Sequence, residues 1–218
     1  WSYDVIILGD INPEPRGDNK MAEHLKNVAE FVRERGGGLL VLGGERYSPQ
    51  AYKNSPLKDI IPVDLTGEKV SSVDPEDGLL ETYRLELTPI GRMHPIFRFS
   101  PDEKENDDIW SKLKPFYWFA DGYVPKRAAE VLATHPTLHV GGKKSGEKHP
   151  ILLQQFAGSG RCMFFGVSEF WRWNWREDQL HFNQFWIQTI RYMARTRVGR
   201  IELRLDRQTP YRRGEPIK

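Results

Sequence analysis

The fold of this chain is decided by the stretch Arg35-Gly36-Gly37-Gly38-Leu39-Leu40-Val41-Leu42-Gly43-Gly44-Glu45-Arg46-Tyr47-Ser48. Its first glycines are typical of a helix end, its apolar residues of a buried strand, and its second glycine pair of a tight turn. Many α/β enzymes hold a nucleophile at such a strand-to-turn corner. Here the corner contains Gly43, Gly44 and Glu45, and it offers no cysteine or serine for attack.

The residues before this stretch complete a β-α-β unit. A continuous apolar run over 3–10, closed by Gly9-Asp10, predicts a strand that is covered on both faces. Apolar residues at helical spacing predict a helix over 20–35, and 39–42 is the next strand. Such a unit implies two parallel strands joined by a right-handed crossover.

Later segments extend this α/β pattern. We expect strands at 83–87, 129–133, 151–156, 162–166 and 201–205, and helices at 106–113 and 178–195. Gly158-Ser159-Gly160 is typical of a hairpin turn. The last helix should bury one stripe of side chains, namely Phe182, Phe185, Trp186, Thr189, Ile190 and Met193.

Composition excludes several classes of protein. The 218 residues fit one domain, with 39% hydrophobic residues and a net charge of +2. This balance argues against a nucleic-acid-binding protein, and no apolar run is long enough for this segment to enter a membrane. The single cysteine, Cys162, excludes an internal disulfide. It lies in an apolar run, so we expect a small buried hydrophobic residue.

Three blocks of sequence together suggest a family. They are Tyr-Asp-Val-Ile-Ile-Leu-Gly-Asp at 3–10, Gly-Gly-Gly-Leu-Leu-Val-Leu-Gly-Gly at 36–44, and Gly-Arg-Cys-Met-Phe-Phe-Gly-Val-Ser-Glu-Phe-Trp-Arg-Trp at 160–173, before a Phe-Trp-Ile-Gln helix from 185. The chain resembles the glutamine amidotransferase-like domains of large bacterial proteins. Those proteins often carry membrane-spanning helices and a von Willebrand A-like domain.

The resemblance implies a fold and a context. The fold is that of class I glutamine amidotransferases: flavodoxin-like, with a mostly parallel sheet and helices on both faces. In such relatives a strand and a helix precede the first block, so we expect this chain to lack them. We expect residues 1–197 to form the amidotransferase-like domain and 198–218 a strand or linker toward a following domain. The resemblance also suggests attachment to the bacterial cytoplasmic membrane through segments outside this chain.

The same resemblance implies a Cys-His-Glu triad, which this sequence lacks. The cysteine of the family follows a core strand, and the matching corner here, 42–45, has no thiol. The histidine of the family lies in a later turn, and the corresponding turn, 167–171, has no histidine. Because the nucleophile and its base are both missing, we expect no glutaminase activity and no cofactor. A non-catalytic binding or scaffold domain is the first hypothesis.

Two interpretations of the strand-end residues stay open. Asp10, Gly43, Gly44, Glu45, Arg46 and Glu169 all follow predicted parallel strands, whose ends line the ligand crevice of open α/β sheets. In one interpretation the polar residues among them contact a ligand in a surviving pocket. In the other, which we favour, they are structural: Asp10 bonds loop backbone, and Glu169 pairs with Arg172 or Arg176.

Tryptophans and histidines support two further hypotheses. Trp171, Trp173 and Trp175 alternate, so an extended segment would turn them to one face as a sugar-stacking platform, with Arg172 beside them; core packing is the commoner use of such aromatics. His94 could be the general base of a hydrolase with a rewired site, although a histidine at a helix start more often bonds backbone. His135 and His139 lack a third metal ligand.

These hypotheses predict different structures. An enzyme should bring acidic and imidazole groups together in one open pocket. A carbohydrate-binding module should expose at least two coplanar tryptophans. A scaffold should have a filled crevice and an apolar patch elsewhere, and its partners would be neighbouring domains of the same polypeptide or another protein.

Overall fold

The computed structural model describes residues 2–14, 20–66, 71–73, 82–140, 146–174 and 179–198. The strand expected at 201–205, together with Trp175 and Arg176, lies outside the described residues. The strands are β1 Val5–Leu8, β2 Gly38–Leu42, β3 Val63–Leu65, β4 Ser71–Val73, β5 Glu86–Leu87, β6 Tyr123–Pro125, β7 Glu130–Val140, β8 Lys148–Ala157 and β9 Gly160–Phe165. The α-helices are α1 Lys20–Arg33, α2 Pro89–Met93, α3 Glu103–Lys112 and α4 Gln179–Val198, and the 3₁₀ turns are η1 Gln50–Asn54, η2 Pro95–Phe97 and η3 Glu169–Asn174.

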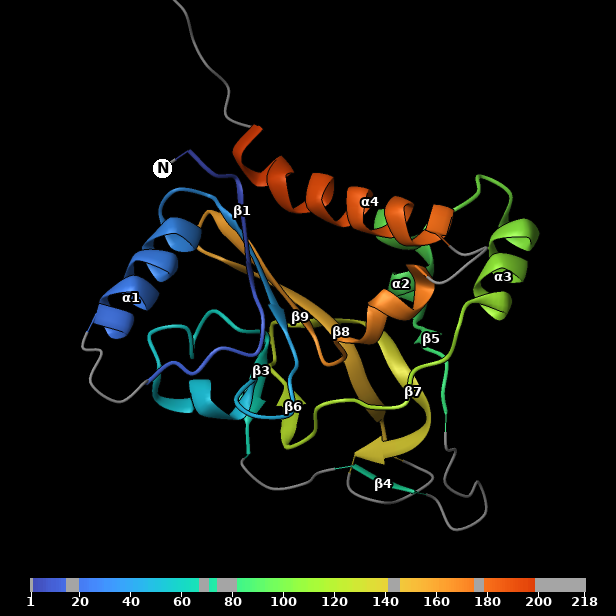
Figure 1. Ribbon diagram of the computed structural model, residues 1–218, viewed down its shortest axis with the longest axis horizontal. Helices are drawn as coiled ribbons and strands as arrows, with labels where there is room; N and C mark the ends of the chain where they lie inside the picture. Colours follow the sequence, from blue (N-terminus) through green and yellow to red (C-terminus); the bar gives the residue numbers. More distant parts are fainter. Residues whose placement is uncertain are drawn as a thin grey trace, which may run out of the picture.

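A seven-stranded mixed sheet forms the centre of this α/β fold (Figure 1). Its order is β1-β2-β9-β8-β7-β4, and β5 also pairs with β7. β1, β2 and β9 are parallel, so the β-α-β unit predicted from the first 42 residues is confirmed. β3 and β6 form a separate two-stranded sheet.

The expected mostly parallel sheet is found only in the β1-β2-β9 half. The β9-β8, β8-β7, β7-β4 and β7-β5 pairs are all antiparallel. For β7-β8 and β8-β9 the physical reason is the short connection between the two strands, because a hairpin needs few residues and a parallel pair needs a long crossover. β8 and β9 are joined by the predicted turn at Gly158, whose φ of +63° suits glycine.

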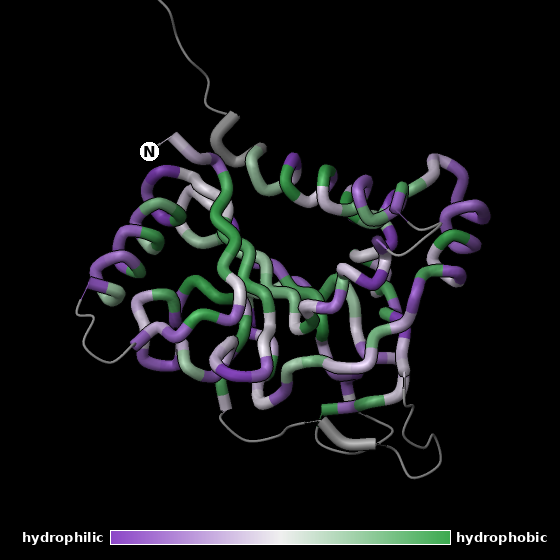
Figure 2. Tube along the Cα trace, viewed as in Figure 1, coloured by the Kyte–Doolittle hydropathy of each residue, from purple (hydrophilic) through white to green (hydrophobic). Residues whose placement is uncertain are grey.

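Helices cover the two faces of the parallel half, as expected. α1 packs on one face, where Phe31 and Val32 belong to the same buried cluster as Leu39 and Phe164. α4 covers the other face through a second cluster, which includes Phe185. Figure 2 shows the hydrophobic colour along the central strands and mixed colours along both helices. Within the described residues, no helix is long and apolar enough to cross a bilayer.

One residue of the predicted inner stripe of α4 faces outward. Phe185, Thr189 and Met193 are fully buried at a spacing of four residues, whereas Ile190 is 44% exposed. Successive helical residues are rotated by 100°, so Ile190 lies well away from the line through its buried neighbours. It shares the outer surface with Leu180 and Ile187, which are also exposed.

The inner and outer faces of α4 should respond differently to truncation. Met193 lies against Gly38 of β2, so Met193→Ala should leave a cavity and lower the free energy of unfolding by about 2–4 kcal/mol. Ile190→Ala, three residues earlier, should change it by less than about 0.5 kcal/mol. Urea unfolding followed by circular dichroism would measure both variants. Equal losses would contradict this packing of α4.

Candidate functional site

The carboxyl ends of the parallel strands meet at one edge of the sheet, as the crevice prediction requires. The backbone N–H of Gly43, after β2, donates to the Phe165 carbonyl at the end of β9, with an N···O distance of 2.6 Å. A Cβ atom built on Gly43 would lie 2.9 Å from the backbone of Gly166. The corner after β2 therefore has no room for a side chain at residue 43.

Asp10 occupies the other side of this corner. Its carboxylate accepts hydrogen bonds from the backbone N–H groups of Arg46, Tyr47 and Ser48, at 2.8–2.9 Å. Slight burial opposes ionisation, but these three bonds outweigh it and lower the pKa of Asp10 below its ordinary value. The structural interpretation of Asp10 is confirmed.

The same carboxyl group excludes a nucleophile from the next position. A Cβ atom built on Gly44 would overlap the side chain of Asp10. In addition, the three N–H groups that could stabilise an oxyanion at this corner already bond Asp10. Residues 43–45 of this corner therefore carry no attacking group, and the N–H groups of residues 46–48 are not free to bind an oxyanion.

Glu169, after β9, is also bound internally. One carboxylate oxygen accepts from the backbone N–H groups of Tyr117 and Trp118, at 2.6 and 3.0 Å. The other accepts from the Arg172 Nε at 3.1 Å, so the expected pair with Arg172 is confirmed. Glu169 thereby fixes residues 114–121, which we call the bridging segment, across the end of the sheet.

The tryptophan platform is not formed by Trp171 and Trp173. They lie on the 3₁₀ turn η3, where side chains three residues apart share a side. Trp173 is 1% exposed beside Phe170, while Trp171 is 58% exposed. An alternating pattern would share a face only in an extended strand, so the sugar-stacking alternative is wrong for these two residues, and the core packing that we considered commoner is found for Trp173.

The bridging segment separates two hollows at this edge. The first, which we call the corner hollow, has a volume of about 290 Å³ and is lined by residues 44–50 and 118–121. It contains the predicted Glu45 and Arg46, both exposed. It is open, contrary to what a filled scaffold crevice would show.

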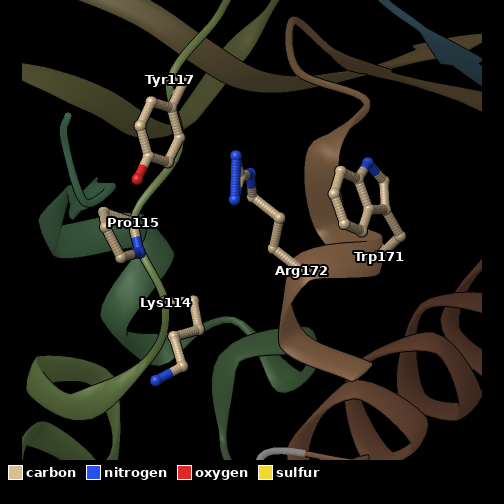
Figure 3. Close-up of a pocket in the computed structure, with 5 residues that line it drawn as sticks. All are labelled: Lys114, Pro115, Tyr117, Trp171 and Arg172. Atoms are coloured by element: carbon tan, nitrogen blue, oxygen red, sulfur yellow. The ribbon is translucent and has the colours of Figure 1, made fainter. Parts of the chain in front are cut away.

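The second hollow, the Arg172 pocket, has a volume of about 330 Å³ and is lined by Lys114, Pro115, Tyr117, Trp171 and Arg172. Figure 3 shows the Arg172 guanidinium between the rings of Tyr117 and Trp171. Its central carbon lies 4.1 Å from the Tyr117 ring centre and 5.0 Å from that of Trp171. Sequence reasoning found Trp171 and Arg172 but missed Tyr117, because no local pattern brings residue 117 near residue 172.

His94 does not join the other candidate residues. Its ring packs on Tyr192 of α4, with 4.3 Å between ring centres, and its Nδ1 accepts a hydrogen bond from the Ile96 N–H. The bond confirms the structural interpretation of a histidine at a helix start. Burial lowers the pKa of His94 to about 4, with Arg161 as a further cause. Arg161 lies at the start of β9, whereas Glu169 follows its end, so the two groups belong to opposite ends of that strand.

Cys162 is fully buried on β9, where it pairs with Leu39 of β2 and with Gln155 of β8. Burial raises the pKa of its thiol far above the ordinary value, so the reactive thiolate does not form near neutral pH. The prediction of a small buried hydrophobic residue is confirmed. Within the described residues, no three His, Cys, Asp or Glu side chains gather as metal ligands.

Comparison with known proteins supports the fold but identifies no family. No family model and no curated protein matched the chain. Cytoplasmic protein STM1381 from Salmonella typhimurium LT2 is similar in structure, with a TM-score of 0.52 and 20% identity over 88% of this chain and 72% of that chain. A catalytic mutant of Gan42B, a GH42 β-galactosidase from G. stearothermophilus, gives a TM-score of 0.41 and 14% identity over 87% of this chain and 21% of that chain. At these identities, the first similarity supports an α/β fold and nothing finer, and the second is too weak for any inference.

Removal of the Asp10 carboxylate should destabilise the corner. Because that group is solvent-exposed, we expect Asp10→Ala to lower the free energy of unfolding by only about 1–2 kcal/mol at neutral pH. The lowered pKa means that this contribution is complete above the unfolded-state pKa of about 4 and is lost as pH falls through the folded-state value. Urea unfolding at several pH values should show the cost of Asp10→Ala shrinking below about pH 4.

Glu45→Ala is the matched control, since Glu45 is an exposed acid in the same corner. It should change the free energy of unfolding by less than about 0.5 kcal/mol at any of these pH values. A pH-independent cost for Asp10→Ala would contradict the assigned hydrogen bonds.

Cys162 should be unreactive in the folded protein. We expect a thiol reagent such as dithionitrobenzoate to modify the single cysteine only after denaturant unfolds the chain. The measurement is the release of thionitrobenzoate with time, with and without urea. Rapid stoichiometric release from the folded protein would place the thiol at an accessible surface and contradict the structure.

Proposed function

We propose that this chain is a non-catalytic, amidotransferase-like domain that binds a ligand or partner without transforming it. One observation carries the proposal: the Asp10 carboxyl group stands where the side chain of a corner nucleophile would be. The corner N–H groups that an acyl-transfer enzyme would direct at an oxyanion are bonded to that carboxylate. The flavodoxin-like arrangement is part of the proposal.

Among the described residues, no imidazole accompanies the acids of this edge for proton transfer. Both oxygens of Glu169 accept internal hydrogen bonds, so this carboxylate is engaged in holding the bridging segment. His94 lies under α4, away from the corner hollow. Glu45 and Asp121 both line the corner hollow, but none of the described residues that line it is a histidine.

Binding remains possible because the edge is open. The corner hollow and the Arg172 pocket lie on either side of the bridging segment, each large enough for a small ligand or a protruding side chain. Their walls are held rigid by the hydrogen bonds of Asp10 and Glu169. Rigid walls reduce the entropic cost of binding. Neighbouring domains of the same polypeptide, or a separate protein, are the partners that we propose.

A hydrolase with a rewired site is the competing function, and turnover assays separate the two. We expect the purified protein to release no ammonia from glutamine and no product from nitrophenyl esters or anilides above the buffer blank. An active glutaminase should be run as the positive control.

The variants Glu45→Gln, Glu169→Gln and His94→Asn complete the test. Turnover by the wild type that disappears in one of them, while circular dichroism shows that variant to be folded, would overturn the proposal. Background hydrolysis that is unchanged in all three would belong to a contaminant and would leave the proposal standing.

A further inference from the structure

We propose that the Arg172 pocket binds a small ligand that carries a carboxylate on a ring. The inference rests on the proposed function, because it supplies the ligand class for a domain that binds without catalysis. It is independent of the amidotransferase resemblance and depends on four described side chains, Tyr117, Glu169, Trp171 and Arg172.

The Arg172 guanidinium is oriented for in-plane recognition. Its Nε donates to Glu169, which fixes the direction of the group. Within the described residues, its two terminal nitrogens make no hydrogen bond, so one edge of the planar fork remains available. A carboxylate matches this edge because two parallel N–H···O bonds can form at once.

Glu169 does not occupy the free edge of the Arg172 guanidinium. Its carboxylate contacts the Nε alone and accepts two further bonds from backbone N–H groups, which hold it in place. Because Glu169 is held in this way, its bond to the Arg172 Nε fixes the position of the guanidinium.

Two exposed aromatic rings favour a ligand that is itself a ring. Tyr117 and Trp171 are each 58% exposed, although both are large and amphipathic. They flank the guanidinium (Figure 3), so a carboxylate bound in its plane would bring the attached ring between or against their faces. Stacking would then cover apolar surface that the protein alone leaves in water.

A carboxylate suits this pocket better than a phosphate. Lys114 also lines the pocket, but Figure 3 shows its ammonium group directed away from the guanidinium. The nearby backbone N–H groups of Tyr117 and Trp118 are bonded to Glu169 and are not available to an anion. Of the two cations among the described lining residues, only the Arg172 guanidinium lies between the aromatic rings, which matches a single negative charge.

Ring-borne carboxylates occur in aromatic acids and in sugar acids, and one experiment tests both sources. Benzoate and glucuronate would be titrated into the protein at low salt, with benzamide and methyl glucoside as their neutral counterparts. Binding would be followed by the indole N–H resonances of the tryptophans, with that of Trp171 identified from a Trp171→Phe variant.

We expect at least one acid to bind with a Kd below about 10 mM and to shift the Trp171 resonance. Its neutral counterpart should bind at least about tenfold more weakly, because the charge-assisted bonds are lost. The acid that binds more tightly identifies the source of the ligand. Arg172→Lys should weaken binding about tenfold, since an ammonium group keeps the charge but not the planar fork.

Arg33→Lys is the matched control, because Arg33 on α1 also pairs with a carboxylate, that of Asp59, at 3.5 Å. It should leave the affinity unchanged. The inference is overturned if neither acid binds, if acid and amide bind equally, or if Arg172→Lys binds like the wild type while remaining folded.

These outcomes are distinguishable from failure of the proposed function. If neither acid binds, the proposed ligand class is wrong, but the proposal of a non-catalytic domain is unaffected. Conversely, chemical conversion of either acid during the titration, visible as new ligand resonances, would overturn the non-catalytic role even if the acid binds at Arg172.

Discussion

The edge of the sheet where the parallel strands end depends on one carboxylate, that of Asp10. It accepts hydrogen bonds from three consecutive backbone N–H groups in the loop after β2. Hydrogen bonds from backbone N–H groups to an ionised carboxylate are stronger than those to a neutral acceptor, so these three bonds fix the sharp turn. Asp10 supplies the carboxylate from the end of the neighbouring strand, β1. The same atoms then fill the space beside Gly44, and the requirement for a stable turn removes the room that a nucleophile would need.

A second carboxylate, Glu169, has the corresponding role after β9. It holds the bridging segment through two backbone N–H groups and directs Arg172 between Tyr117 and Trp171. The two acids therefore shape two hollows without offering a free base to either. Within the described residues, this edge has stable walls and exposed aromatic surface, and no acid, base and nucleophile converge on it. This combination is the physical basis of the proposed binding role.

Local patterns predicted the elements well where one chemical rule dominated. The apolar run before Asp10 and the glycines around residues 36 and 43 correctly placed β1, β2 and the tight corner that follows β2. Gly158 correctly placed the β8-β9 hairpin. Prediction failed where two geometries fit one pattern. Alternating tryptophans share a face in a strand but not on the 3₁₀ turn η3, and Ile190 fits the helical spacing of the inner stripe of α4 yet faces outward.

The sequence by itself determined that residues 43–45, two glycines and a glutamate, carry no thiol or hydroxyl, whatever the surrounding fold. It also determined that Asp10 and Glu169 would follow parallel strands. Only the tertiary structure decided what these acids bond, that His94 lies apart from them, and that Tyr117 joins Arg172. Those facts depend on contacts across 37 to 55 residues of chain between positions such as 10 and 47 or 117 and 172, and no local periodicity carries that information.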